Sequence, residues 1–221
     1  MDARYTLVTG SKNNSSWSLR PWLAMKIAGL PFSEQPIPWH GPGTKAEILL
    51  HSPSGKVPAL KTGSFVVCDS LAILEYLAER HPEAALWPGD EEARAIARSA
   101  SAEMHSGFVT LRNEMSMELL TTLPMPPIGD ALASDISRIV AIWRGVRSRY
   151  GSGGPYLFGA FSNADAMFAP VSTRFRTYGV DLGAFGDDGS ASAYAETVLA
   201  LPEMAEWTEG AEAEMKVRAS A

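Results

Sequence analysis

The chain has 221 residues, of which 46% are hydrophobic and 20% are charged, and its formal net charge at pH 7 is -6. This composition is typical of a folded globular protein and excludes a disordered or fibrous chain. The 19 lysines and arginines are scattered and form no basic cluster, so nucleic acid is not an expected partner.

The N-terminal residues and the cysteine content restrict the compartment and the chemistry. The segment 1–5 lacks the basic stretch and apolar run of a secretory signal, and no segment is apolar for long enough to cross a bilayer. We therefore expect a cytoplasmic protein with no membrane partner. A single cysteine, Cys68, excludes an internal disulfide, a zinc site built on several cysteines and a Cys-x-x-Cys redox pair, and no metal site is expected.

The first eighty residues alternate between predicted strands and predicted helices. Polar and apolar alternation and turn residues predict four strands, at 5–9, 32–37, 58–61 and 65–67. Helical spacing of apolar residues predicts three helices, at 17–30, 44–50 and 69–80. The order βαβαββα indicates an α/β domain.

Strand signals end after residue 90, and the remaining chain is predicted to be helical. Apolar stripes predict helices at 96–119, 132–150, 162–178, 193–201 and 202–215, the first of them ending before the prolines at 124–127. We therefore place an α/β domain at 1–81, a linker at 82–91 and an all-α domain at 92–221. Ser162 to Asp165 forms a capping box, which we interpret as a folding device.

Three local features carry the candidate chemistry. The first is the polar run 13–20, where the first strand leads into the first helix. A serine here either caps the helix or presents its hydroxyl to an anion beside the helix N-terminus. The second is Lys56-Val57-Pro58, where the proline either marks an edge strand or follows a cis bond in a sharp turn. Such a turn would leave the peptide groups of Val57 free to pair with a bound peptide.

The third feature is Asp69-Ser70, at the start of the helix after the hairpin. Either residue is suited to an N-cap. Alternatively, Ser70 and the exposed amides of that helix would bind a carboxylate, while Asp69 would bind an ammonium group.

Taken together, these motifs resemble the glutathione S-transferase family, and most of all its zeta class. Residues 15–20, Ser-Ser-Trp-Ser-Leu-Arg, are similar to the zeta-class run Ser-Ser-Cys-Ser-x-Arg, with Trp17 in place of the cysteine. The run 52–60, with its Val-Pro turn, and the run 69–77, with its acidic residue followed by serine, also resemble family motifs. The resemblance implies a thioredoxin-like N-terminal domain, an all-helical second domain and a homodimer.

The resemblance also implies glutathione as co-substrate and places Ser15 on the family's catalytic serine. Ser15 would stabilise the glutathione thiolate as a hydrogen-bond donor, with Ser16 and Ser18 as alternatives. The expected glutathione-binding residues are Ser15, Ser16, Lys56, Val57, Pro58, Asp69 and Ser70, with His40 and Lys45 as further candidates for the glycyl carboxylate. The small electrophile would meet Trp17, His105, Arg112 and Arg174.

Three other functions remain open beside a transferase. A maleylacetoacetate-type cis-trans isomerase needs a cation for its acidic substrate, but the family's arginine aligns with Thr177, and Arg174 lies one turn earlier. A non-catalytic glutathione-binding protein, or a scaffold, would keep the fold without the chemistry. Mixed-disulfide exchange would use Cys68, which the strand pattern predicts to be a buried structural thiol.

Overall fold

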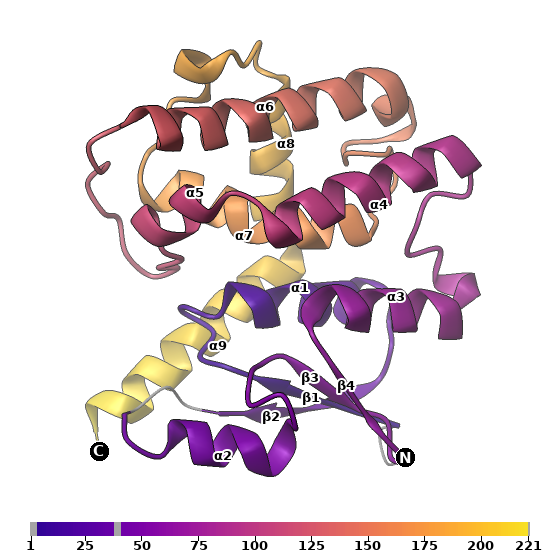
Figure 1. Cartoon of the computed structure of the whole chain (residues 1–221), viewed down its shortest axis with the longest axis vertical. Helices are drawn as coiled ribbons and strands as arrows, with labels where there is room; N and C mark the ends of the chain where they lie inside the picture. The colour runs from indigo at the N-terminus through magenta and orange to yellow at the C-terminus, as the bar shows by residue number, and fades with distance from the viewer. Residues whose placement is uncertain (1–3, 38–40, 221) are drawn as a thin grey trace.

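The computed structural model describes residues 4–37 and 41–220. They form a four-stranded sheet with flanking helices, followed by a helical part. In Figure 1 the helices between residues 91 and 199 lie above the sheet, while the last helix, Pro202–Ala219, runs down beside it. The first part contains β1 (Tyr5–Thr9), α1 (Ser16–Ile27), β2 (Phe32–Pro36), α2 (Thr44–His51), β3 (Ala59–Lys61), β4 (Val66–Cys68) and α3 (Ser70–Arg80). The second contains α4 (Glu91–Ser106), α5 (Val109–Glu114), α6 (Asp130–Tyr150), α7 (Asn163–Thr177), α8 (Ser190–Leu199) and α9 (Pro202–Ala219), and 3-10 turns lie at Pro82–Ala84, Gly151–Gly153 and Leu182–Phe185.

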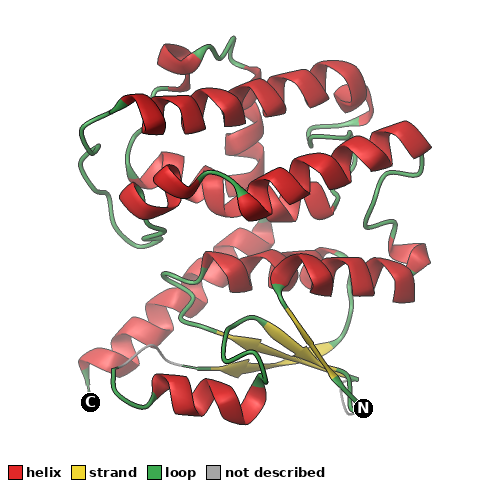
Figure 2. Cartoon of the chain, in the orientation of Figure 1, coloured by secondary structure: helices red, strands yellow, loops and turns green. Residues whose placement is uncertain are grey.

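The sheet has the mixed topology of a thioredoxin-like domain. Its strand order is β2-β1-β3-β4, with β1 parallel to β2 and antiparallel to β3, and β3 antiparallel to β4. Helices α1 and α3 cover the face that points to the helical part, and α2 lies on the other face (Figure 1). The predicted order βαβαββα is confirmed, and strands occur only in this part of the chain as coloured in Figure 2, apart from two isolated bridges at 156–160.

Buried apolar side chains join the two parts into one core. A single cluster extends from Tyr5 and Trp22, under the sheet helices, to Trp143 in α6 and Trp207 in α9. Helix α7, which lies at the centre of the helical part, packs against α1, α4 and α8. Ser16 and Arg174 therefore approach one another across the boundary between the parts.

The predicted helix at 96–119 is wrong, because the chain breaks there into α4 and α5. Gly107 is extended and Phe108 has a φ of 54°, so neither continues α4. Phe108 buries its ring, and Asp135 of α6 accepts a hydrogen bond from the Leu111 amide in the first turn of α5. Tertiary packing thus overrides the apolar stripe, and residues 115–129 form an irregular connection before α6.

The other helical predictions agree with the structure to within a few residues, except that α8 begins at Ser190 instead of 193. The capping box is present: the amide of Ser162 donates to Asp165 Oδ2 at 2.8 Å. The exact domain limits at 81 and 91 stay a prediction. Among the described residues, no helix is both long and apolar enough to cross a membrane.

Candidate functional site

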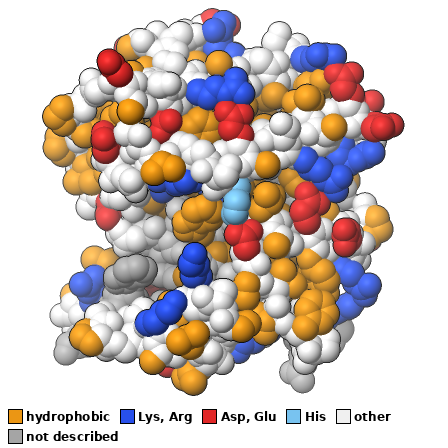
Figure 3. Space-filling view, viewed as in Figure 1, with side chains coloured by type: hydrophobic (Ala, Val, Ile, Leu, Met, Phe, Trp, Pro, Cys, Tyr) orange, Lys and Arg blue, Asp and Glu red, His pale blue; other side chains and the backbone are white. Residues whose placement is uncertain are grey.

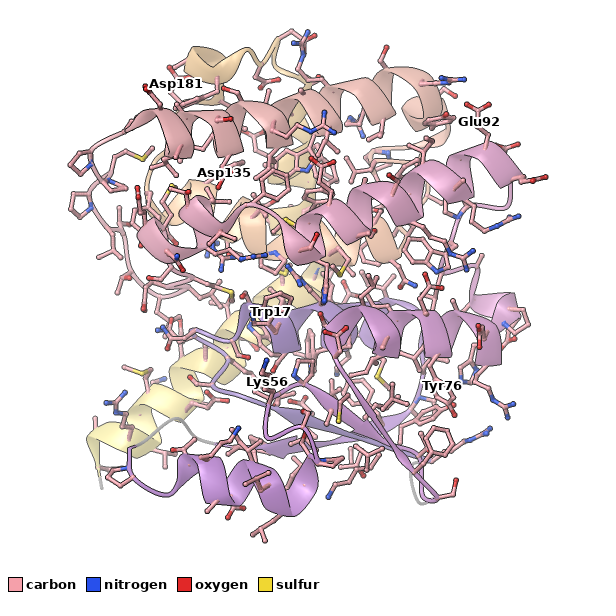
Figure 4. All side chains as sticks on the ribbon, in the orientation of Figure 1. Trp17, Lys56, Tyr76, Glu92, Asp135 and Asp181 are labelled. Atoms are coloured by element: carbon pink, nitrogen blue, oxygen red, sulfur yellow. The ribbon has the colours of Figure 1, made fainter. Side chains whose placement is uncertain are left out.

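Two adjoining cavities open on the sheet part, and the smaller of them reaches His105 of the helical part. The larger, of about 810 Å³, is lined by the loop before α1, by α2 and by residues 55–57. The smaller, of about 540 Å³, is lined by residues 56–58, 68–70 and His105. Because Trp17, Lys56 and Val57 line both, the cavities form one continuous cleft. Acidic, basic and histidine side chains gather around the middle of this face in Figure 3, and Figure 4 shows Trp17 at the junction with Lys56 below it.

Ser15 is the serine of the 15–18 run that lines the cleft. It stands at the N-cap position of α1, but within the described part of this helix its side chain makes no capping hydrogen bond. Its Oγ donates to Ser18 Oγ at 2.7 Å, and Ser18 Oγ accepts from the Gly10 amide at 3.0 Å. Ser16 and Ser18 are buried and line neither cavity. The hydroxyl of Ser15 therefore faces the cleft at the positive end of α1.

Gly10 at the end of β1 lets Ser15 lie close to the strand. A Cβ at this position would be 3.1 Å from both Ser15 Oγ and Val57 Cγ2. The site thus brings together the end of β1, the start of α1 and the Val57–Pro58 turn. The Val57–Pro58 bond is cis, one of the two alternatives that the sequence left open.

Asp69 and Ser70 form the far end of the cleft. Asp69 caps α3, because its Oδ1 accepts from the amides of Leu71 at 2.9 Å and Ala72 at 3.1 Å. Its Oδ2 lies 3.1 Å from Nε2 of His105, which projects from α4 of the helical part. Asp69 therefore caps the helix through one oxygen and leaves the other beside the cleft, while its binding of an ammonium group stays a prediction.

His105 lines this end of the cleft, and its role toward a second substrate stays a prediction. Burial lowers the pKa of His105, the cationic Arg20 and Arg112 lower it further, and Asp69 opposes them. Because an ionised carboxylate only accepts hydrogen bonds, Nε2 is the nitrogen of His105 that donates to Asp69. Trp17 contacts it edge to face, with ring centroids 5.2 Å apart.

Two arginines, Arg20 and Arg112, lie against the Trp17 ring, and a third, Arg174, contacts the neighbouring Ser16. The guanidinium of Arg20 lies 4.3 Å from the Trp17 ring centroid and that of Arg112 lies 5.5 Å from it, while Arg174 donates to Ser16 Oγ at 3.3 Å. Burial and the neighbouring guanidiniums lower the pKa of Arg20 to about 9 and that of Arg174 to about 10, so both stay charged at neutral pH. Among the described residues, no carboxylate forms an ion pair with any of the three arginines.

Arg20 was not among the residues that the sequence analysis selected. Its guanidinium is buried and donates to Ser70 Oγ at 3.4 Å, so it places a positive charge behind the Asp69–Ser70 end of the cleft. Its position in the 15–20 motif was the feature of the sequence that could have identified it as a candidate site residue. Arg112 and Arg174 line neither cavity, since Arg174 is buried and donates to the carbonyls of Met115 and Pro170.

Of the remaining predicted residues, three line the cavities and one lies in the segment 38–40, which the structure does not describe. Lys45 and Lys56 are exposed and line the larger cavity, with Lys45 Nζ donating to the Gly55 carbonyl at 2.6 Å. His40 lies outside the described residues. Cys68 is half-buried and lines the smaller cavity, contrary to the buried thiol that was expected. Burial raises its pKa, but hydrogen bonds with Ser52 and Ser54 outweigh burial and lower the pKa overall.

Comparison with known proteins identifies relatives that cover up to 79% of the chain. Residues 14–80 match the family model of the glutathione S-transferase N-terminal domain. A maleylacetoacetate isomerase of Rattus norvegicus is 30% identical over 178 residues, which cover 79% of each chain. A zeta-class glutathione S-transferase of Euphorbia esula is 37% identical over 100 residues, covering 45% of this chain and 44% of that protein.

The fold also matches solved structures along nearly its full length. A glutathione transferase homologue from Burkholderia, solved with bound glutathione, superposes with a TM-score of 0.70 at 23% identity and covers 94% of this chain and 97% of its own. A Tau-class glutathione S-transferase from Mangifera indica gives a TM-score of 0.71 at 18% identity, with 96% of this chain and 97% of that chain covered. Similarities at this level establish the fold.

Proposed function

The chain belongs to the glutathione S-transferase family, and we propose that it is a transferase in which Ser15 holds the glutathione thiolate for attack on a small electrophile. One observation carries the proposal: Ser15 places its hydroxyl in a cleft that continues past the Val57–Pro58 turn to Asp69 and Ser70. A hydroxyl donor, an extended backbone segment and a carboxylate-binding helix start are the groups that this tripeptide thiol requires.

The two ends of the cleft match the two ends of glutathione. At the α3 end, the γ-glutamyl carboxylate would accept hydrogen bonds from Ser70, which Arg20 supports with positive charge. The γ-glutamyl ammonium would bind Asp69 Oδ2, the oxygen that His105 now contacts. Val57 would pair with the peptide through its backbone. Lys45 and Lys56 would meet the glycyl carboxylate at the other end.

Hydrogen bonding through Ser15 can supply the required shift in thiol pKa. A free thiol titrates near 8.5, and lowering its pKa by about two units requires roughly 2.7 kcal/mol. A hydrogen bond to a charged group contributes about 1.5–3 kcal/mol, and the helix N-terminus adds about 0.3–1 kcal/mol. Serine acts here as a donor and not as a nucleophile.

The Ser15–Ser18 contact explains how the donor would be oriented. In the structure Ser15 Oγ donates to Ser18 Oγ at 2.7 Å, and Ser18 Oγ also accepts from the Gly10 amide. With a thiolate bound, the hydrogen bond between the two serines would reverse, and Ser18 would donate to Ser15. Ser15 would then donate its proton to the thiolate. The chain from the Gly10 amide through Ser18 and Ser15 to sulfur polarises each hydrogen bond in turn.

A glutathione-dependent isomerase of the maleylacetoacetate type is the second candidate. It is favoured by the unpaired guanidiniums of Arg20, Arg112 and Arg174, which would attract an acidic substrate. Trp17 now covers two of them, so an acidic substrate would reach the arginines only if the indole moved. Turnover of an activated aryl halide, maleylacetone and a hydroperoxide, each assayed with glutathione, separates the candidates.

Calorimetric titration with glutathione tests the site itself. We expect the Ser70→Ala variant to bind glutathione at least about tenfold more weakly, because a carboxylate loses a charge-assisted hydrogen bond. Ser64→Ala, an exposed serine in the hairpin turn, is the control and should bind as the wild type does. Wild-type protein that binds no glutathione would refute the proposal and revive a role as a scaffold. The expected homodimer stays a prediction, which sedimentation would test.

A further inference from the structure

The loop that carries Ser15 is anchored by the helical part of the chain. This loop, Ser11–Ser15, connects β1 to α1. Within it, the amides of Asn14 and Ser15 donate to the Ser11 carbonyl, and Asn13 Nδ2 donates to Asn14 Oδ1 at 3.4 Å. The side chains of Asn13 and Asn14 point to residues more than a hundred positions later in the chain. The position of Ser15 therefore depends on contacts that its own domain does not provide.

Glu118 makes the central contact with this loop. One carboxylate oxygen accepts from Asn13 Nδ2 at 2.9 Å, and the other accepts from Asn14 Nδ2 at 2.6 Å. Backbone groups beside it complete the contact: the Leu119 amide donates to the Asn13 carbonyl at 3.2 Å, and the Leu120 amide donates to Asn13 Oδ1 at 3.0 Å. Both oxygens of one carboxylate thus bind the two residues that precede Ser15.

The segment that carries Glu118 is itself fixed to the core helix α7. Thr177 Oγ1 donates to the Glu118 carbonyl at 2.8 Å, and Arg176 donates to the Leu119 carbonyl at 3.2 Å. Two successive contacts therefore connect the buried helix to the Ser15 loop: Thr177 binds the backbone of Glu118, and the Glu118 carboxylate binds the loop. A rigid helix is a more exact support for a donor than a polar loop alone.

We propose that Glu118 is a positioning residue for Ser15, which sets the direction of the serine hydroxyl toward the glutathione sulfur. This role rests on the function proposed above. Small displacements of a donor reduce the stabilisation of a developing charge steeply, because hydrogen bonds weaken with distance and misalignment. Glu118 does not line either cavity, so it acts through the loop and not on the substrate.

The test is a titration of the bound glutathione thiol, followed by the ultraviolet absorbance of the thiolate, in a double-mutant cycle. The variants are Glu118→Ala, Ser15→Ala and the two combined, with Glu114→Ala as control, because Glu114 is an exposed glutamate at the end of α5. We expect Glu118→Ala to raise the thiol pKa by about one unit, which corresponds to a roughly tenfold smaller acid dissociation constant of the bound thiol. Glu114→Ala should leave the pKa unchanged.

The combined variant distinguishes positioning from general weakening of the fold. If Glu118 acts through Ser15, its replacement has no further effect on the thiol pKa once Ser15 is alanine. Additive shifts, or a Glu118→Ala pKa equal to that of the wild type, would overturn the proposal. Should Glu118→Ala not fold, Glu118→Gln keeps the volume and one acceptor oxygen, and a smaller rise in pKa is then expected. Failure of wild-type protein to lower the thiol pKa at all would instead refute the function proposed above.

Discussion

Asp69 is the residue in which structural and binding roles are most closely combined. One oxygen caps α3, and the other meets His105 across the boundary between the two parts. Its backbone has a φ of 84°, a region that asparagine and aspartate tolerate better than alanine. Replacements of Asp69 can therefore distinguish the effect of its negative charge from the effect of its hydrogen bonds that cap α3.

We predict different outcomes for the two replacements of Asp69. Asp69→Asn keeps an acceptor for the cap and tolerates the backbone, so its unfolding free energy should stay within about 0.5 kcal/mol of the wild type. It loses the negative charge, and glutathione should bind about tenfold more weakly. Asp69→Ala should also lose about 2 kcal/mol of stability, because it removes the cap and places alanine in the left-handed region.

Chemical denaturation and calorimetric binding of the two Asp69 variants are the measurements required. Equal loss of stability in both variants would contradict the capping role. Unchanged glutathione affinity in Asp69→Asn would contradict the role of the charge.

Local sequence could indicate Ser15, Asp69 and Ser70, because each stands where a strand or hairpin leads into a helix and offers the right chemical group. It could not indicate Glu118 or the Asp69–His105 contact. These groups are far apart in the chain, and only the packing of the helical part on the sheet part brings them together.

At the scale of the elements, helix α7 organises the helical part. Fourteen of its fifteen residues are buried, although its sequence includes Asp165, Arg174 and several hydroxyl groups. Asp165 accepts from the amides of Leu157 and Ser162 and from Ser162 Oγ. Burial raises its pKa from 3.8 to about 6 despite these hydrogen bonds.

The raised pKa of Asp165 predicts a specific pH dependence of stability. Because the folded state binds this proton more tightly than the unfolded state, the stabilisation is complete below about pH 4 and is lost as the pH rises through about 6. The loss is about 3 kcal/mol, at 1.36 kcal/mol per pKa unit. Asp165→Asn cannot titrate, so the stability of the wild type relative to this variant should fall by that amount from pH 4 to pH 7.

Urea denaturation of both proteins at several pH values measures this difference. A wild-type advantage that increases with pH would show that the hydrogen bonds, rather than burial, set the pKa of Asp165.

Element boundaries could be predicted where local signals are strong and failed where packing decides. Pro202 at the first turn of α9 and the Ser162–Asp165 box mark their helices in the sequence alone. The break at Gly107–Phe108 does not, because Phe108 takes a left-handed conformation in order to bury its ring. An apolar stripe is compatible with either one helix or two.

At the scale of the whole molecule, the two parts share one core and together form the cleft. The sheet part supplies Ser15, Val57 and Ser70, while the helical part supplies His105 and the support of Glu118. Strand and helix order, together with three short motifs, were enough to predict the thioredoxin-like and all-helical architecture. The electrophile was not predictable, because the surroundings of Trp17 depend on arginines from three different helices.

The pKa of the glutathione thiol in the complex decides whether Ser15 activates it. Wild-type protein should lower this pKa by about two units from the value near 8.5 of the free thiol, and Ser15→Ala should return it most of the way while glutathione affinity at acidic pH stays nearly unchanged. Ser16→Ala is the matched control, because Ser16 is buried toward Arg174 and should leave the pKa low. A Ser15→Ala complex with the wild-type thiol pKa and full turnover at neutral pH would contradict the role assigned to Ser15.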